Sequence, residues 1–186
     1  ASEVVSAYLL PELLLRLRQQ HPEIQIELVA SNEVENLLDR SADIAVRMVR
    51  PAQDLLIARK LADWPLGLFA HRSYLARRGV PTLQTMAEHD WLGYDRSDQL
   101  LRGFAAAGFQ VDREFFALRC DQQTVLWEAL RAGLGLGIGL KSLAARDPEL
   151  IQVLPELPIP PLPLWLTAHR ELRDTPRLRV VFDAIA

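Results

Sequence analysis

The stretch Ser41-Ala42-Asp43-Ile44-Ala45-Val46-Arg47 decides the fold class, because it is an apolar strand preceded by two other strongly patterned runs. In the first, residues 4–20, apolar side chains recur at the spacing of an amphipathic helix. The dipeptide His21-Pro22 ends that helix, since the residue before proline disfavours the α region. Residues 24–28 then alternate between apolar and polar side chains, which predicts a strand.

The stretch 41–47 belongs to a repeated pattern of helices and strands. We expect a short helix over residues 33–40 and a strand over residues 43–48. Helix, strand, helix and strand at such short spacings predict an α/β fold with a parallel sheet. Open parallel sheets bind small ligands at the carboxyl ends of their strands, so we searched these ends for polar side chains.

Composition restricts the class of protein. The 186 residues are 49% hydrophobic and 24% charged, which is typical of a globular chain. No run of about 18 apolar residues is present, so we expect no membrane partner. The net charge of −3, with scattered arginines, gives no surface suited to a phosphate backbone. The single cysteine, Cys120, excludes an internal disulfide and is compatible with a reducing compartment.

The rest of the chain repeats the β/α pattern and predicts two lobes. The first lobe is expected at residues 1–68 plus 165–186, and the second at residues 69–164, so that two crossing strands join them. Further elements follow from periodicity and capping residues, from Gly79, Gly108 and Gly133, which are expected to end helices, and from Pro176, which is expected to begin the last helix. Strands are predicted at 55–61, 64–70, 91–94, 115–119, 134–140 and 164–166, and helices at 71–78, 82–88, 98–107, 122–132 and 175–186.

Several motifs in this order resemble the C-terminal effector-binding domain of LysR-type transcriptional regulators. They are Leu10-Pro11-Glu12-Leu13-Leu14, His21-Pro22-Glu23-Ile24, Ala42-Asp43-Ile44-Ala45-Val46-Arg47, Gly133-Leu134-Gly135-Leu136-Gly137-Ile138, and Pro163-Leu164-Trp165-Leu166 followed by His169. The resemblance covers essentially the whole chain. It implies two Rossmann-like α/β lobes joined by two crossing strands, as in type II periplasmic binding proteins, with a small ligand between the lobes.

The resemblance also implies partners. The family carries an N-terminal winged helix-turn-helix, which is absent from this chain, so DNA would be bound only through that domain. The β-strand that normally precedes Ala1 is likewise missing, which would leave unpaired edges in the first sheet. We expect self-association as a homodimer or homotetramer, through the apolar surface that Leu9, Leu10 and Leu15 extend around the first helix.

The predicted effector site collects polar residues at strand ends and helix starts. Ser2 and Glu3 precede the first helix, where N–H groups can receive a carboxylate, although Ser2 is equally suited to be a helix cap. In the second lobe, Gln123 and Thr124 are the strongest candidates for direct contact, and Asp121 is expected to cap their helix. The complete predicted set is Ser2, Glu3, Ser31, Asn32, Tyr94, Asp95, Gln122, Gln123 and Thr124.

Two of these residues, and Arg47, have structural alternatives. Asn32 is well placed to cap the helix over residues 33–40, and Tyr94 can simply pack with its hydroxyl outward. Arg47 can clamp an anion, but we favour an ion pair with Asp43 or Glu35.

No catalytic or metal-binding pattern stands out. The four histidines lack metal-ligand spacing and are expected at the solvated surface, and Cys120 is expected to be a buried apolar thiol without a local base. The glycine-rich run 133–139 departs from the dinucleotide-binding motif at Ile138 and follows a helix. We therefore predict no catalytic residue, no metal and no cofactor.

The sequence thus predicts a cytoplasmic, non-catalytic sensor. A small polar or carboxylated effector would bind between the lobes and shift their open and closed populations, which would change DNA binding and transcription. The alternative is a free solute-binding protein of a transporter, which shares the fold but is usually longer and secreted. Which effector binds, and whether it activates or represses, is not encoded in a recognisable motif.

Overall fold

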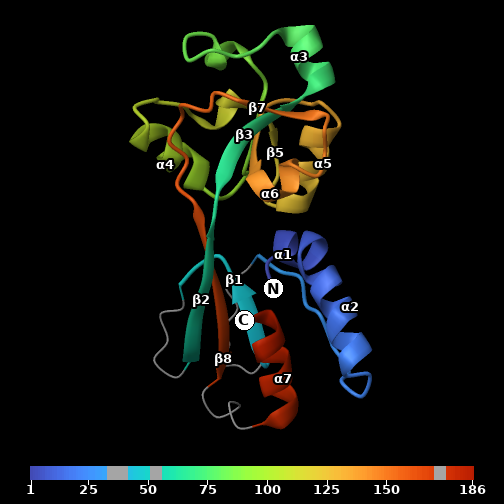
Figure 1. Cartoon of the computed structure of the whole chain (residues 1–186). Helices are drawn as coiled ribbons and strands as arrows, with labels where there is room; N and C mark the ends of the chain where they lie inside the picture. The colour runs from blue at the N-terminus through green and yellow to red at the C-terminus, as the bar shows by residue number, and fades with distance from the viewer. Residues whose placement is uncertain (33–41, 51–55, 170–174) are drawn as a thin grey trace. The chain divides into compact units, whose positions relative to one another are not determined.

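A computed structural model describes residues 1–32, 42–50, 56–169 and 175–186 (Figure 1). The predicted helix over residues 33–40 lies outside the described residues. The chain forms two compact units, one of Ala1–Trp64 with Leu162–Ala186 and one of Pro65–Pro161. The expected lobe boundaries, 68/69 and 164/165, lie a few residues from these. No helix in the described part is long and apolar enough to cross a membrane.

The first unit contains a three-stranded sheet of order β1-β8-β2, formed by Ile44–Arg47, Leu162–His169 and Leu56–Trp64. Both outer strands run antiparallel to β8, with Val46 and Arg59 each opposite Leu166. The parallel sheet predicted from the local order of elements is therefore wrong for these strands. The partner of β1 comes from more than a hundred residues further along the chain, which local periodicity does not encode.

Three helices pack with this sheet. The single helix predicted over residues 4–20 is broken at Leu9 into α1 (Glu3–Tyr8) and α2 (Leu10–Gln20), because Pro11 occupies the first turn of a new helix. The C-terminal helix α7 (Pro176–Ile185) begins at the proline expected for it and contacts α2 (Figure 1). The core of this unit consists of Val5, Leu10, Val46, Leu164 and Leu166.

The strand predicted over residues 24–28 does not form. Its backbone has no ladder partner among the described residues, and the preceding turn is held instead by the Arg18 guanidinium, which donates to the carbonyls of Pro22 and Ile24. Alternation predicts an extended chain, but a strand also requires a neighbour with matching hydrogen bonds.

The second unit contains two small sheets. Strand β3 (Leu66–His71) lies between β6 (Gly137–Leu140) and β7 (Leu150–Val153), antiparallel to both. Strands β4 (Trp91–Gly93) and β5 (Phe116–Arg119) form the one parallel pair among the described strands. An isolated parallel bridge between Trp91 and Leu136 extends this pairing towards β6.

Glycines end the helices of this unit as predicted. Helix α3 (Arg72–Arg78) stops at Gly79, whose φ is +82°, and Gly108 and Gly133 also take positive φ after α4 (Gln99–Ala106) and α5 (Gln123–Arg131). The helix predicted over residues 82–88 is wrong in extent: only Met86–Glu88 form a short 3-10 helix. A short 3-10 helix (Arg113–Phe115) and helix α6 (Lys141–Ala144) complete the unit.

An aromatic cluster forms the core of the second unit. Trp91 meets Phe104 edge-on at 4.9 Å, and Phe104 meets Phe115 edge-on at 5.3 Å. The glycine-rich run near β6 serves this packing, because a Cβ on Gly139 would lie 2.6 Å from the Trp127 ring. Gly139 therefore leaves the space that the Trp127 side chain occupies.

Candidate functional site

The predicted residues of the first unit are brought together by backbone hydrogen bonds around its first residues. Ala1 donates to the Val29 carbonyl at 2.7 Å and accepts from Ser31 N–H at 2.9 Å. Ser2 N–H donates to the Val46 carbonyl of β1 at 3.3 Å. Residues 1–2 are therefore hydrogen-bonded to the segment 29–31 on one side and to β1 on the other.

Ser2 is the most unusual residue of this group. It immediately precedes α1, but its side chain makes no capping hydrogen bond, so the predicted cap does not form. The residue is 6% exposed, and its Oγ is buried without a hydrogen-bond partner in the described part of the chain. The Glu3 Oε2 atom is likewise buried without a hydrogen-bond partner among the described residues. Buried hydroxyls are nearly always bonded, so Ser2 has unused capacity to donate and accept.

The side chains of Asn32 and Arg47 make hydrogen bonds to the backbone near Ser2. The Asn32 Oδ1 atom accepts from Glu3 N–H at 3.1 Å, so its side chain binds the first helix. The Arg47 guanidinium donates to the Ser31 carbonyl at 2.5 Å. This contact to Ser31 was not anticipated from the sequence, which suggested an anion or a carboxylate partner. Among the described residues no ion pair joins Arg47 to Asp43, and the other predicted partner, Glu35, lies outside the described residues.

In the second unit, two predicted residues meet directly. The Gln123 side-chain amide, at the start of α5, donates to the Tyr94 hydroxyl at 3.2 Å. Burial raises the pKa of Tyr94, and the negative charge of Asp121 adds to that rise. Tyr94 is therefore protonated at neutral pH and can donate its hydroxyl hydrogen.

The other two predicted residues of α5 are less engaged. Gln122 is exposed and takes the N-cap position without a side-chain capping bond. Thr124 is half-buried, and its hydroxyl makes no hydrogen bond within the described ranges. Since the first N–H groups of a helix lack intrahelical acceptors, this end of α5 offers donors beside Gln123.

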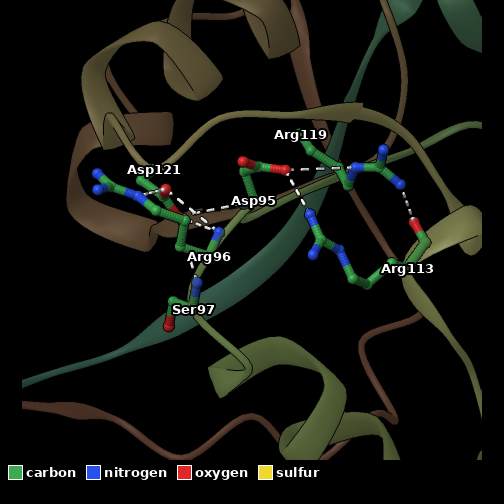
Figure 2. A network of polar contacts seen from close by, with 6 residues as sticks. All are labelled: Asp95, Arg96, Ser97, Arg113, Arg119 and Asp121. Carbon is green, nitrogen blue, oxygen red and sulfur yellow. Dashed lines mark hydrogen bonds and ion pairs between the residues drawn. The ribbon is translucent and has the colours of Figure 1, made fainter.

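Asp121 does not cap α5, which corrects the prediction. Its carboxylate instead accepts the backbone N–H groups of Asp95, Arg96 and Ser97 at 3.1, 3.0 and 3.4 Å, and pairs with the Arg96 guanidinium at 2.9 Å (Figure 2). The Arg96 guanidinium, followed by these N–H groups, lowers the pKa of Asp121. Local sequence could not reveal this partner, which lies about 25 residues earlier.

Asp95, a predicted site residue, is engaged with arginines. Its Oδ1 atom lies 2.7 Å from Arg113 Nη2 and 3.6 Å from Arg119 Nε (Figure 2). It also lines a pocket of about 580 Å³ along β5, together with Glu114, Phe116, Ala117, Leu118 and Arg119. The remaining predicted residues of this unit do not line that pocket.

The described residues were also compared with the predictions for the metal site, the histidines and the cysteine. No group of three or more histidine, cysteine, aspartate or glutamate side chains is placed to hold a metal ion there. His89 is buried at 9% exposure, so the expected surface position is wrong for this histidine. Cys120 is half-buried, less enclosed than predicted.

Known proteins similar to this chain are transcriptional regulators. Over 94 residues the chain is 33% identical to the HTH-type transcriptional regulator CrgA of Neisseria meningitidis, which covers 50% of this chain and 31% of CrgA. Over 140 residues it is 24% identical to the HTH-type transcriptional activator AaeR of Escherichia coli, which covers 73% and 45%. These matches span less than half the length of either relative.

Solved structures share the fold. The regulatory domain of Neisseria meningitidis CrgA superimposes with a TM-score of 0.85 at 24% identity, covering 98% of this chain and 93% of that one. The regulatory domain of AphB from Vibrio vulnificus gives a TM-score of 0.76 at 19% identity, covering 99% and 93%. The predicted fold class of two α/β lobes is thereby confirmed. Residues 1–186 match the family described as LysR substrate binding domain, and the chain belongs to that family.

Proposed function

We propose that this domain binds a small polar or carboxylated effector and thereby regulates transcription through a DNA-binding domain carried by the whole protein. The observation that supports this most strongly is the buried Ser2 hydroxyl, which has no hydrogen-bond partner among the described residues. A ligand oxygen would satisfy it. Membership of the LysR substrate-binding family supports the same function, and the solute-binding alternative is not favoured by the relatives found.

The chemistry of the second unit supports the same class of effector. The Tyr94 hydroxyl and the N–H groups at the start of α5 are donors, whereas the Gln123 amide can both donate and accept. Donors of this kind favour carbonyl and carboxylate oxygens. We propose that Ser2, Glu3, Ser31, Asn32, Tyr94, Asp95, Gln122, Gln123 and Thr124 contribute to effector binding.

A thermal-shift screen of small organic acids and amino acids tests this function. A ligand at one hundred times its dissociation constant stabilises the folded state by about 2.7 kcal/mol. We expect a hit whose shift is lost in Ser2→Ala and in Thr124→Ala but kept in Ser6→Ala. Ser6 is the control because it is also buried, while its hydroxyl already binds the Ala1 carbonyl. Hits that survive both site substitutions would place the binding site elsewhere.

We also propose that the domain self-associates through the outer face of α2. Leu10 is buried in its own unit and so cannot contribute, but Leu15 is 60% exposed on the same helix. An exposed leucine beside a packed helix face is compatible with an interface. Leu15→Glu should reduce the mass measured by light scattering, whereas Val80→Glu, at a 68% exposed valine of the other unit, should not. Equal masses for all three proteins would exclude this face.

A further inference from the structure

We propose that Asp121 is a positioning residue for the effector site, because its carboxylate holds the turn at residues 95–97 and so brings Tyr94 to Gln123. The inference rests on the proposed function of those two residues. It adds a residue that does not itself touch the effector.

The Asp121 carboxylate joins two chain segments through its hydrogen bonds to residues 95–97, and we call this set of bonds the clasp. Oδ1 accepts three successive backbone N–H groups, from Asp95, Arg96 and Ser97, and Oδ2 accepts a second bond from Arg96 N–H at 3.2 Å (Figure 2). A carboxylate that receives several N–H groups fixes a turn through charge-assisted bonds. Side-chain replacement at the turn would leave these bonds in place, because they are donated by backbone N–H groups; the Arg96 side chain adds a separate ion pair with Asp121.

The clasp continues the parallel pairing of β4 and β5. Gly93 and Arg119 are the last paired residues of the two strands, and Cys120 N–H then donates to the Gly93 carbonyl at 2.9 Å. Asp121 is the next residue, and it binds the turn that follows Tyr94. The two segments therefore remain aligned beyond the sheet, and two residues later Gln123 reaches the Tyr94 hydroxyl.

A second carboxylate ties the same turn to a different part of the unit. The Asp95 side chain pairs with Arg113, and the Arg119 guanidinium, which lies 3.6 Å from Asp95, also donates to the Arg113 carbonyl at 2.9 Å (Figure 2). Asp95 thus links the turn to β5 and the 3-10 helix before it. With Asp121 holding the backbone, the turn is restrained through two independent sets of bonds.

The backbone bonds should matter more than the Arg96 ion pair. The Arg96 side chain is 83% exposed, and exposed ion pairs contribute little. The Asp121 side chain is 26% exposed. We therefore expect Arg96→Gln to leave the turn intact, whereas Asp121→Asn weakens it by replacing the carboxylate with a neutral amide.

Asp147 supplies a matched control. Its carboxylate pairs with Arg131 at 2.9 Å, accepts Glu149 N–H at 3.1 Å, and has a similar side-chain exposure of 21%. The Arg131 guanidinium also lowers the pKa of Asp147. Asp147→Asn therefore removes a comparable carboxylate from the same unit without touching the turn.

The test uses NMR on the ligand-free domain and on the three variants. In Asp121→Asn, we expect the amides of Arg96 and Ser97 to exchange with solvent about tenfold faster. The Gln123 side-chain NH2 signals should move towards those of exposed Gln122. Asp147→Asn and Arg96→Gln should leave both measurements unchanged.

Two results would overturn the inference. Unchanged exchange and unchanged Gln123 signals in Asp121→Asn would show that the turn is held without this carboxylate. Equal loosening in Arg96→Gln would assign the effect to the surface ion pair. Because both measurements are made without effector, an effector screen without hits would count against the proposed function and leave this inference to be decided by the NMR data.

Discussion

Ser2→Ala should leave the ligand-free domain as stable as the parent or make it more stable, although it changes a buried residue. In the structure the Ser2 hydroxyl is buried and makes no hydrogen bond with the described residues. Its backbone bonds, from Ser2 N–H to Val46 and from Ser6 N–H to Ser2, do not involve the side chain and persist in alanine.

The magnitude follows from the cost of an unpaired buried polar group, about 1–3 kcal/mol. Removing the hydroxyl relieves part of that cost, so we expect a change in unfolding free energy between zero and a gain of about 1 kcal/mol. Loss of an N-cap normally costs about 1 kcal/mol, but here no cap bond exists to be lost. Ser6→Ala removes a hydroxyl that does have a partner and should cost about 1 kcal/mol.

The assay is equilibrium unfolding in urea of the parent and the two alanine variants, followed by tryptophan fluorescence. The variants should differ by about 1–2 kcal/mol, with Ser2→Ala the more stable. A Ser2→Ala protein as destabilised as Ser6→Ala, or more so, would refute the argument, because it would show that the Ser2 hydroxyl is bonded within the folded domain. For effector affinity we expect the opposite order, with Ser2→Ala binding the effector more weakly than Ser6→Ala.

Two further predictions concern the second unit. Burial, helped by the Arg78 charge, lowers the pKa of His89 below 6.5. As the pH falls below 6.5, the unfolded chain therefore binds a proton before the folded chain does, and the free energy of unfolding decreases until the folded-state pKa is reached. His89→Gln should flatten this dependence of stability on pH, as measured by urea unfolding. Gly139→Ala should cost about 1–3 kcal/mol, since its Cβ would meet the Trp127 ring at 2.6 Å, whereas Gly103→Ala, with open space inside α4, should gain about 0.5–1 kcal/mol by the same unfolding assay.

Features with a local physical cause could be predicted from the sequence. Gly79, Gly108 and Gly133 were expected to end helices, and each takes the positive φ that glycine tolerates best. Pro176 was expected to begin the last helix and does so. The apolar strand at Ile44–Arg47 was found within one residue of its expected ends.

Features that depend on distant partners could not be predicted. The direction of the strands depends on β8, which pairs with both β1 and β2 but follows them by about a hundred residues or more. Asp121 stands where a helix cap is expected, yet it binds a turn about 25 residues earlier. For the proposed site, sequence could name Tyr94 and Gln123 but not their hydrogen bond, because that bond depends on this clasp.

The most direct test of effector binding is an NMR titration of the domain with each hit from the thermal-shift screen. The account predicts that one compound shifts the backbone amide signals of Ser2 and Asn32 together with those of Gln123 and Thr124, with the same dissociation constant at all four. Shifts confined to the β5 pocket around Glu114, with none at these four residues, would contradict the proposed effector site.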